Sequence, residues 1–188
     1  MTLSSLAYSN QPSGKVCGTY VPNICVDYRP SQLSDCYEVA SIMSKKDAYE
    51  VLSSGGLSPL EALKFSFERS YECNTIVRNG EPMGMFGCGF GDHQLYGIPW
   101  MLTDGNFEGF KKRFLKEGRS WIEKLKNRHQ ILYNYVHDQN DDSIRWLQWL
   151  GFKFMRAIPN YGFGKSDTFY EFYLVSDQCV VLEEPTLV

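Results

Sequence analysis

The stretch that most constrains this fold runs from residue 131 to residue 154, with the sequence I-L-Y-N-Y-V-H-D-Q-N-D-D-S-I-R-W-L-Q-W-L-G-F-K-F. Its first seven residues, 131–137, are mostly aliphatic or aromatic and include no glycine or proline. Such a run predicts a buried or half-buried β-strand. The polar residues 138–140 end this strand, so a different element has to begin there.

A short helix is predicted directly after the strand. Asn140 or Asp141 can cap its N-terminus, and Gly151 can supply the left-handed turn that ends it. Its apolar positions recur at steps of three and share one face: Ile144, Leu147 and Leu150. Phe152 then opens another strand, so strand, helix and strand follow one another without a long loop.

The start of the chain also divides into elements. A strand at Ile24–Tyr28 is ended by Arg29-Pro30-Ser31, because proline disfavours helix in the residue before it. Ser31 is expected to cap a helix that turns Asp35 and Glu38 outward. The buried stripe of that helix is predicted to be Leu33, Cys36, Tyr37, Ala40 and Met43.

Two further helical segments precede the second strand. Residues 46–52 form one, which Gly55-Gly56 stops. The next begins with Ser58 as N-cap, Pro59 at the first helical position and Glu61 as the acid of a capping box. Its buried face is predicted to be Leu60, Leu63 and Phe67.

The rest of the chain alternates strands with one long helix. Residues 73–77 and 83–88 are predicted to form a hairpin, because Asn79-Gly80 between β-rich runs is a strong turn signal. Residues 98–103 form the next strand and residues 107–128 the longest helix. The last two strands are residues 152–158 and 169–175.

The N-x-x-S-x-x-x-L-x-x-x-G-F spacing of Asn140, Ser143, Gly151 and Phe152 resembles the GCN5-related N-acetyltransferases, the GNAT family. The order of elements over residues 24–175 is that of the whole GNAT fold. The resemblance implies the α+β class, with a mixed, mostly antiparallel central sheet flanked by about four helices.

One GNAT-like domain is predicted for residues 23–176. Residues 1–22, rich in Ser, Asn, Gly and Pro, are expected to form an N-terminal arm, and residues 177–188 a C-terminal tail. Of the 188 residues, 43% are hydrophobic and 22% charged, which is enough apolar material for such a core. No signal peptide or membrane span is expected.

Charge and cysteine usage exclude some classes of function. The formal charge of −3 gives no global argument for binding nucleic acid. The six cysteines are scattered, with no C-x-x-C and no histidine at zinc-finger spacing. We therefore expect reduced thiols and no metal site.

The GNAT resemblance implies a donor site between the strands at 98–103 and 131–137, which splay apart in the family around the pantetheine arm of acyl-CoA. It implies acetyl-CoA as cofactor and direct acyl transfer to an amine. In that reaction a carboxylate or a water removes the amine proton and backbone N–H groups hold the carbonyl oxygen. The implied cofactor-binding residues are Thr103, Gly105, Gly109, Lys111, Lys112 and Asn140.

Asp104 and His137 are the catalytic candidates near that gap, and a helix cap or a surface position is the alternative for each. The family's pyrophosphate loop, Q/R-x-x-G-x-G/A, is T-D-G-N-F-E-G here, with Asp104 and Glu108 adding negative charge. The tyrosine that often protonates the leaving thiolate, four residues before Gly151, is Leu147.

Four short sequence segments resemble segments of the internal virion proteins of short-tailed phages, a family that is itself acetyltransferase-like. They are Y-R-P-S at 28–31, S-P-L-E-A-L at 58–63, G-I-P-W-M-L at 97–102 and S-I-R-W-L-Q-W-L-G-F-K-F-M at 143–155. This resemblance implies a bacteriophage protein of the virion, the host cytoplasm or both.

Two functions fit these patterns. The first is an acyl-CoA-dependent N-acetyltransferase, with Lys111, Lys112 and Arg113 assisting the phosphate loop. The second is a non-catalytic GNAT-like protein of virion assembly or host interaction. A phage or host protein would bind the N-terminal arm or the helix 107–128, which has an excess of five positive charges. Nucleic acid is the least favoured partner, because the aromatic residues of that helix lie on its opposite face.

Overall fold

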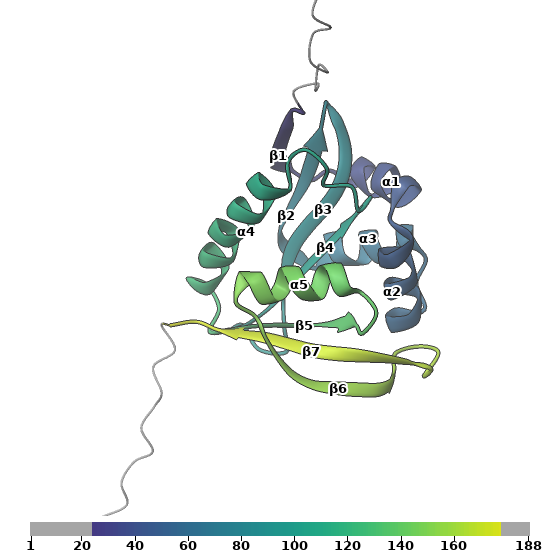
Figure 1. Cartoon of the computed structure of the whole chain (residues 1–188), viewed down its shortest axis with the longest axis vertical. Coiled ribbons are helices and arrows are strands. Elements are labelled where there is room, and N and C mark those ends of the chain that lie inside the picture. The colour runs from purple at the N-terminus through teal and green to yellow at the C-terminus, as the bar shows by residue number, and fades with distance from the viewer. Residues whose placement is uncertain (1–23, 178–188) are drawn as a thin grey trace, which may run out of the picture.

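The computed structural model describes residues 24–177 as seven strands and five helices (Figure 1). In chain order these are β1 (Val26–Pro30), α1 (Leu33–Ile42), α2 (Lys45–Gly55), α3 (Pro59–Arg69), β2 (Ser70–Arg78), β3 (Glu81–Phe90), β4 (Tyr96–Thr103), α4 (Lys111–Lys126), β5 (Ile131–His137), α5 (Asp141–Leu150), β6 (Lys153–Tyr161) and β7 (Asp167–Val175). The predicted N-terminal arm and nearly all of the predicted C-terminal tail lie outside the described residues. No helix within residues 24–177 is long and apolar enough to cross a membrane.

The seven strands form one sheet in the order β1-β2-β3-β4-β5-β7-β6. Every neighbouring pair is antiparallel except β4 and β5, which are parallel. Helices α4 and α5 cover one face, whereas α1 and α3 cover the other and α2 lies beside α3 (Figure 1). The mixed, mostly antiparallel sheet is therefore confirmed, with five helices around it rather than about four.

Two of the three core clusters in the described residues join the helices to opposite faces of the sheet. The first joins α4 and α5 to the sheet and includes Ile122, Leu125, Leu132, Leu147 and Phe172. The second joins α1 and α3 to the opposite face through Cys36, Val39, Leu63 and Met85. Because both faces of the sheet are covered, its central strands are largely buried.

Local signals in the sequence place the helix ends that flank the site. The Ser58 side chain accepts the Glu61 N–H and the Glu61 carboxylate accepts the Ser58 N–H, so the predicted capping box is confirmed. Asn140 accepts the Ser143 N–H at the start of α5. Gly151 ends that helix with a φ of 98°, which glycine adopts without steric cost.

Helix α1 departs most from the prediction. Asp35, expected to face outward, is 1% exposed and receives two 2.7 Å hydrogen bonds from Arg29. Burial alone would raise the pKa of Asp35, but the bonds from Arg29, the Gln32 N–H and Thr75 hold it below its usual range. Periodicity missed this carboxylate because its ion-pair partner comes from β1 and a further hydrogen-bond donor from β2.

Other boundaries near α1 are also corrected. Gln32, not Ser31, is the N-cap, because Gln32 and Asp35 form the capping box. Leu33 and Tyr37 are 47% and 51% exposed, since the buried stripe is centred on Asp35, Cys36 and Val39 instead. The first strand, predicted at 24–28, is Val26–Pro30 because it pairs with β2 up to Pro30.

The long helix starts later than its apolar pattern indicates. It was predicted over 107–128 and spans Lys111–Lys126. Gly109 has a φ of 82°, which an α-helix cannot contain, so Phe107 and Phe110 lie in a turn before the helix. Both still pack beside Phe114, which explains why they matched the helical period.

Candidate active site

Strands β4 and β5 are neighbours in the sheet but pair over only two residues. Tyr96 lies opposite Ile131 and Gly97 opposite Leu132. The next bond of this parallel ladder would need the N–H of residue 99, which is a proline and has none. The strands separate beyond that point, as the GNAT resemblance implies.

A cavity of about 760 Å³ runs through this gap. Helices α2 and α3 line it on one face of the sheet with Glu50, Val51 and Phe65. Helices α4 and α5 line it on the other face with Trp121, Trp146 and Leu147. A cavity of this size and mixed lining is typical of a site for small ligands.

The β4 edge of the gap has its backbone groups satisfied at both ends. Near the ladder, the Asn134 side chain donates to the Pro99 carbonyl at 3.0 Å. At the far end, the Thr103 N–H donates to Asp47 at 3.0 Å and the Thr103 carbonyl accepts the Ser44 N–H at 2.8 Å. Met101 lies between them, and strand alternation directs its N–H and C=O to the same side as those of Thr103.

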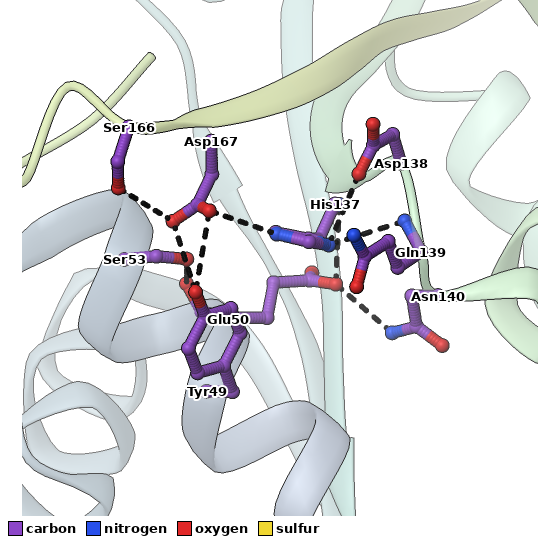
Figure 2. A network of polar contacts seen from close by, with 9 residues as sticks. All are labelled: Tyr49, Glu50, Ser53, His137, Asp138, Gln139, Asn140, Ser166 and Asp167. Carbon is purple, nitrogen blue, oxygen red and sulfur yellow. Dashed lines mark hydrogen bonds and ion pairs between the residues drawn. The ribbon is translucent and has the colours of Figure 1, made fainter. Parts of the chain in front are cut away.

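At the end of β5, a carboxylate from α2 accepts hydrogen bonds from the strand and from the residues that follow it. The Glu50 carboxylate accepts the His137 N–H at 3.3 Å and the Asn140 side-chain N–H at 2.9 Å (Figure 2). Asp47 and Glu50 lie three residues apart on α2, so one helix contacts both strands of the gap. Helix α2 thus bridges β4 and β5 at the far end of the gap, where the two strands no longer pair.

These two carboxylates lie in surroundings that favour their neutral forms. Burial raises the pKa of Glu50 to about 7, although the bonds from Asn140 and His137 oppose the shift. Burial likewise raises the pKa of Asp47 to about 6, against the bonds from Thr103 and Ser44. Glu50 as a residue is only half-buried, yet its carboxylate is enclosed at the cavity wall. A carboxylate with such a pKa suits proton transfer near neutral pH.

His137, one of the two catalytic candidates, is buried behind this wall with 4% exposure. Its Nδ1 accepts the Gln139 N–H at 3.1 Å, so the hydrogen-bond network assigns the proton of the neutral ring to Nε2. Nε2 lies 3.8 Å from an Asp167 oxygen, and Tyr49 donates to the same carboxylate (Figure 2). His137 therefore contributes its backbone, not its ring, to the position of Glu50.

Asp104, the other candidate, lies in the loop before α4 and is not among the residues that line the cavity. Its carboxylate pairs with Arg78 at 2.6 Å and also accepts the Asn106 N–H at 2.8 Å. Arg78 bonds the Asn106 carbonyl as well. Asp104 thus holds the loop in shape.

The same loop leaves few amides for a pyrophosphate. The Gly105 N–H donates to Thr103 Oγ1 at 3.1 Å, and the Glu108 N–H donates to the Asn106 side chain at 3.1 Å. Space above Gly105 is taken by Ser44, and space above Gly109 by Ile24. The loop therefore does not fit a pyrophosphate group, whereas the gap fits a pantetheine arm.

Of the other predicted cofactor residues, Thr103 and Asn140 lie at the two edges of the gap. Lys111 and Lys112 are exposed in the first turn of α4. Sequence reasoning missed Glu50 and Asp47, because acidic residues on an amphipathic helix usually face solvent. It also missed Pro99, although a proline inside a central strand was a usable signal.

No protein-family model matches this chain, and neither does any curated protein sequence. Solved structures do. A GNAT-family acetyltransferase of Streptococcus pneumoniae matches with a TM-score of 0.56 at 15% identity, covering 80% of this chain and 98% of that one. The ribosomal-protein-S18-alanine N-acetyltransferase of Escherichia coli matches at 0.59 and 13%, covering 85% and 99%.

Spermidine N-acetyltransferase of Vibrio cholerae, solved with CoA and spermine, matches at 0.60 and 10%, covering 80% and 95%. All three similarities extend over nearly the whole of the matched chains. The chain therefore has the GNAT fold.

Proposed function

We propose that this chain transfers an acyl group from acyl-CoA to a primary amine, with Glu50 as the base. The observation that carries the proposal is the cavity between β4 and β5, into which Glu50 brings a carboxylate whose pKa is raised to about 7. The solved neighbours support it, since one holds CoA with spermine and another is named for acetylating alanine of a ribosomal protein.

When bound, acyl-CoA supplies the acyl thioester. The Met101 N–H, on the free part of the β4 edge, is the proposed donor to the thioester oxygen as that oxygen gains charge. Glu50 accepts the proton that the amine loses as its nitrogen bonds to the acyl carbon and the carbon–sulfur bond breaks. Asn140 keeps Glu50 in place through its 2.9 Å bond.

At two places the sequence differs from the GNAT pattern, and each difference removes a group that would assist acyl transfer or nucleotide binding. Leu147 lines the cavity where the family often has a tyrosine, so the departing thiolate takes its proton from solvent. The loop 103–109 holds the nucleotide weakly, so Lys111 and Lys112 are left as the phosphate contacts.

Calorimetric titration with acetyl-CoA tests the proposal, followed by mass spectrometry of acetylated products from a panel of primary amines. We expect micromolar binding, about −8 kcal/mol, and transfer to at least one amine. Glu50→Gln is expected to keep the binding and lose the transfer. No binding at millimolar acetyl-CoA would overturn the proposal.

A non-catalytic GNAT-like protein is the second candidate, and the occupied amides of loop 103–109 together with Leu147 favour it. Such a protein would bind a phage or host protein through the basic face of α4 or through the N-terminal arm. Absence of acetyl-CoA binding, with capture of one defined partner by the basic face, would support it. Loss of that capture in Lys111→Glu/Lys112→Glu would locate the contact.

We propose a bacteriophage origin, because four short sequence segments resemble internal virion proteins. We also propose that residues 23–176 form one GNAT-like domain. The protein would then act in the infected host cytoplasm or in the virion. Mass spectrometry of purified particles of the encoding phage separates these two. Finding the chain in particles supports a virion component, and finding it only in infected-cell lysate supports a cytoplasmic one.

A further inference from the structure

The cavity has two halves, one on each face of the sheet. The half beside α4 and α5 is where the proposed donor arm lies, so the half beside α2 and α3 is left for the amine. Glu50 stands between them at the gap. The side chains that line the half of the cavity beside α2 and α3 therefore determine which kind of amine can bind there.

Aromatic rings from five different elements line that half. They are Phe65 of α3, Trp100 of β4, Tyr135 of β5, Tyr161 of β6 and Phe169 of β7. Tyr135 and Tyr161 are stacked with ring centroids 4.8 Å apart, and Tyr161 lies 4.9 Å from Phe169. Phe65 is 50% exposed at the mouth, so its ring is accessible to a ligand in the cavity.

Charged groups are few on the same side. Glu50 is the carboxylate at the gap, and Asp92 and Arg69 are exposed residues of the lining. The Arg69 guanidinium lies 4.4 Å from the centre of the Phe65 ring. Since Arg69 offsets Asp92, a second positive charge on the acceptor would find no net attraction there.

We infer that the acceptor is a primary monoamine attached to an apolar or aromatic group, not a polyamine. This inference rests on the proposed function and adds the class of acceptor to it. The aromatic rings would hold the apolar part and attract the single ammonium by cation–π contact. The ammonium would lose its first proton to solvent, and Glu50 would accept the second as the nitrogen bonds to the acyl carbon. A polyamine would need further carboxylates for its other ammonium groups, and beyond Glu50 the described lining has only Asp92, which Arg69 offsets.

Competition between 2-phenylethylamine and spermidine for acetyl transfer tests the inference. With both at equal concentration and acetyl-CoA in excess, mass spectrometry should detect acetyl-phenylethylamine in about tenfold or greater excess. Phe65→Ala should lower kcat/KM for phenylethylamine about tenfold and leave the Kd for acetyl-CoA within twofold. Leu33→Ala, which removes an equally exposed apolar side chain from α1 outside the cavity, is the matched control and should change neither.

The outcomes separate this inference from the proposed function. Preferred acetylation of spermidine, or an unchanged kcat/KM in Phe65→Ala, would overturn the inference while leaving acyl transfer in place. Failure to bind acetyl-CoA would overturn the proposed function and the inference together. Arg69→Glu sharpens the result, because it should raise the small rate with spermidine several-fold if Arg69 disfavours polycations.

Discussion

The gap between β4 and β5 has the features of the proposed acyl-transfer site, whereas the loop 103–109 has few free amides for a phosphate. In the gap, Pro99 ends the ladder and the Met101 amide is left at a free strand edge. In the loop, the amides of Gly105 and Glu108 are already hydrogen-bonded within the chain. The two regions lie at opposite ends of the same proposed donor site.

The difference teaches that the two ends of such a site can change independently. The gap depends on strand pairing, which the whole sheet enforces through its core. The phosphate loop depends on a few unpaired amides and small residues, so Asp104 with Arg78 and Ile24 beside Gly109 are enough to close it. A chain can therefore have the cleft of the fold without a functional phosphate-binding loop.

Glu50→Gln should have the largest effect of the proposed variants, and the effect should be on the rate of acyl transfer. Loss of the proton acceptor is expected to lower kcat/KM about 100- to 10,000-fold in a transfer assay. Acetyl-CoA affinity should stay within about threefold, because Glu50 contacts the strands and not the loop. Glu38→Gln, on the exposed face of α1, is the control, and an equal loss in both variants would contradict the role of Glu50.

The pH dependence of kcat/KM should follow the protonation of the same carboxylate. The pKa of Glu50 is raised to about 7, and only its deprotonated form accepts a proton. The rate is therefore expected to rise about tenfold per pH unit below 7 and to level off above pH 8. A flat profile between pH 5.5 and 8 in the same assay would rule Glu50 out as the base.

Pro99→Ala should narrow the gap by restoring a ladder donor. An N–H at residue 99 can reach the Tyr133 carbonyl and extend the β4–β5 pairing by one bond. A shift of that kind displaces the Met101 amide, so we expect kcat/KM to fall about tenfold or more. The matched change Pro159→Ala, in β6 and outside the cavity, should have no effect; if it lowers the rate equally, the ladder explanation fails.

Lys111→Glu/Lys112→Glu should have the smallest effect, and it should be on the affinity for acetyl-CoA. These two lysines lie at the end of the proposed donor site that meets the phosphates. Both lysines are exposed in the first turn of α4, where a single charge contact typically contributes about 0.5 kcal/mol. Calorimetry should therefore give a Kd for acetyl-CoA raised by less than about tenfold, with the difference decreasing as salt is added. A hundredfold loss would mean that the loop end carries most of the affinity.

The sequence predicted those parts of the molecule that depend on local patterns. Strand 131–137, the cap at Asn140, the turn at Gly151 and the capping box of Ser58 with Glu61 are all confirmed. These are short-range signals, in which the residues that make the contact are neighbours in the chain.

Contacts between distant segments could not be predicted in the same way. Glu50 meets His137 and Asn140, which are about ninety residues away along the chain. Asp35 is buried because Arg29 and Thr75 reach it from two strands. On helical periodicity alone, such carboxylates look like solvent-facing residues, and only the tertiary fold assigns their partners.

A crystal structure of the protein with acetyl-CoA would test the central claim most directly. We predict the thioester between β4 and β5, with its carbonyl oxygen within hydrogen-bond distance of the Met101 N–H, the Glu50 carboxylate facing the acyl carbon, and the nucleotide without amide contacts from loop 103–109. A gap closed by protein side chains, or a CoA bound elsewhere on the chain, would contradict the account.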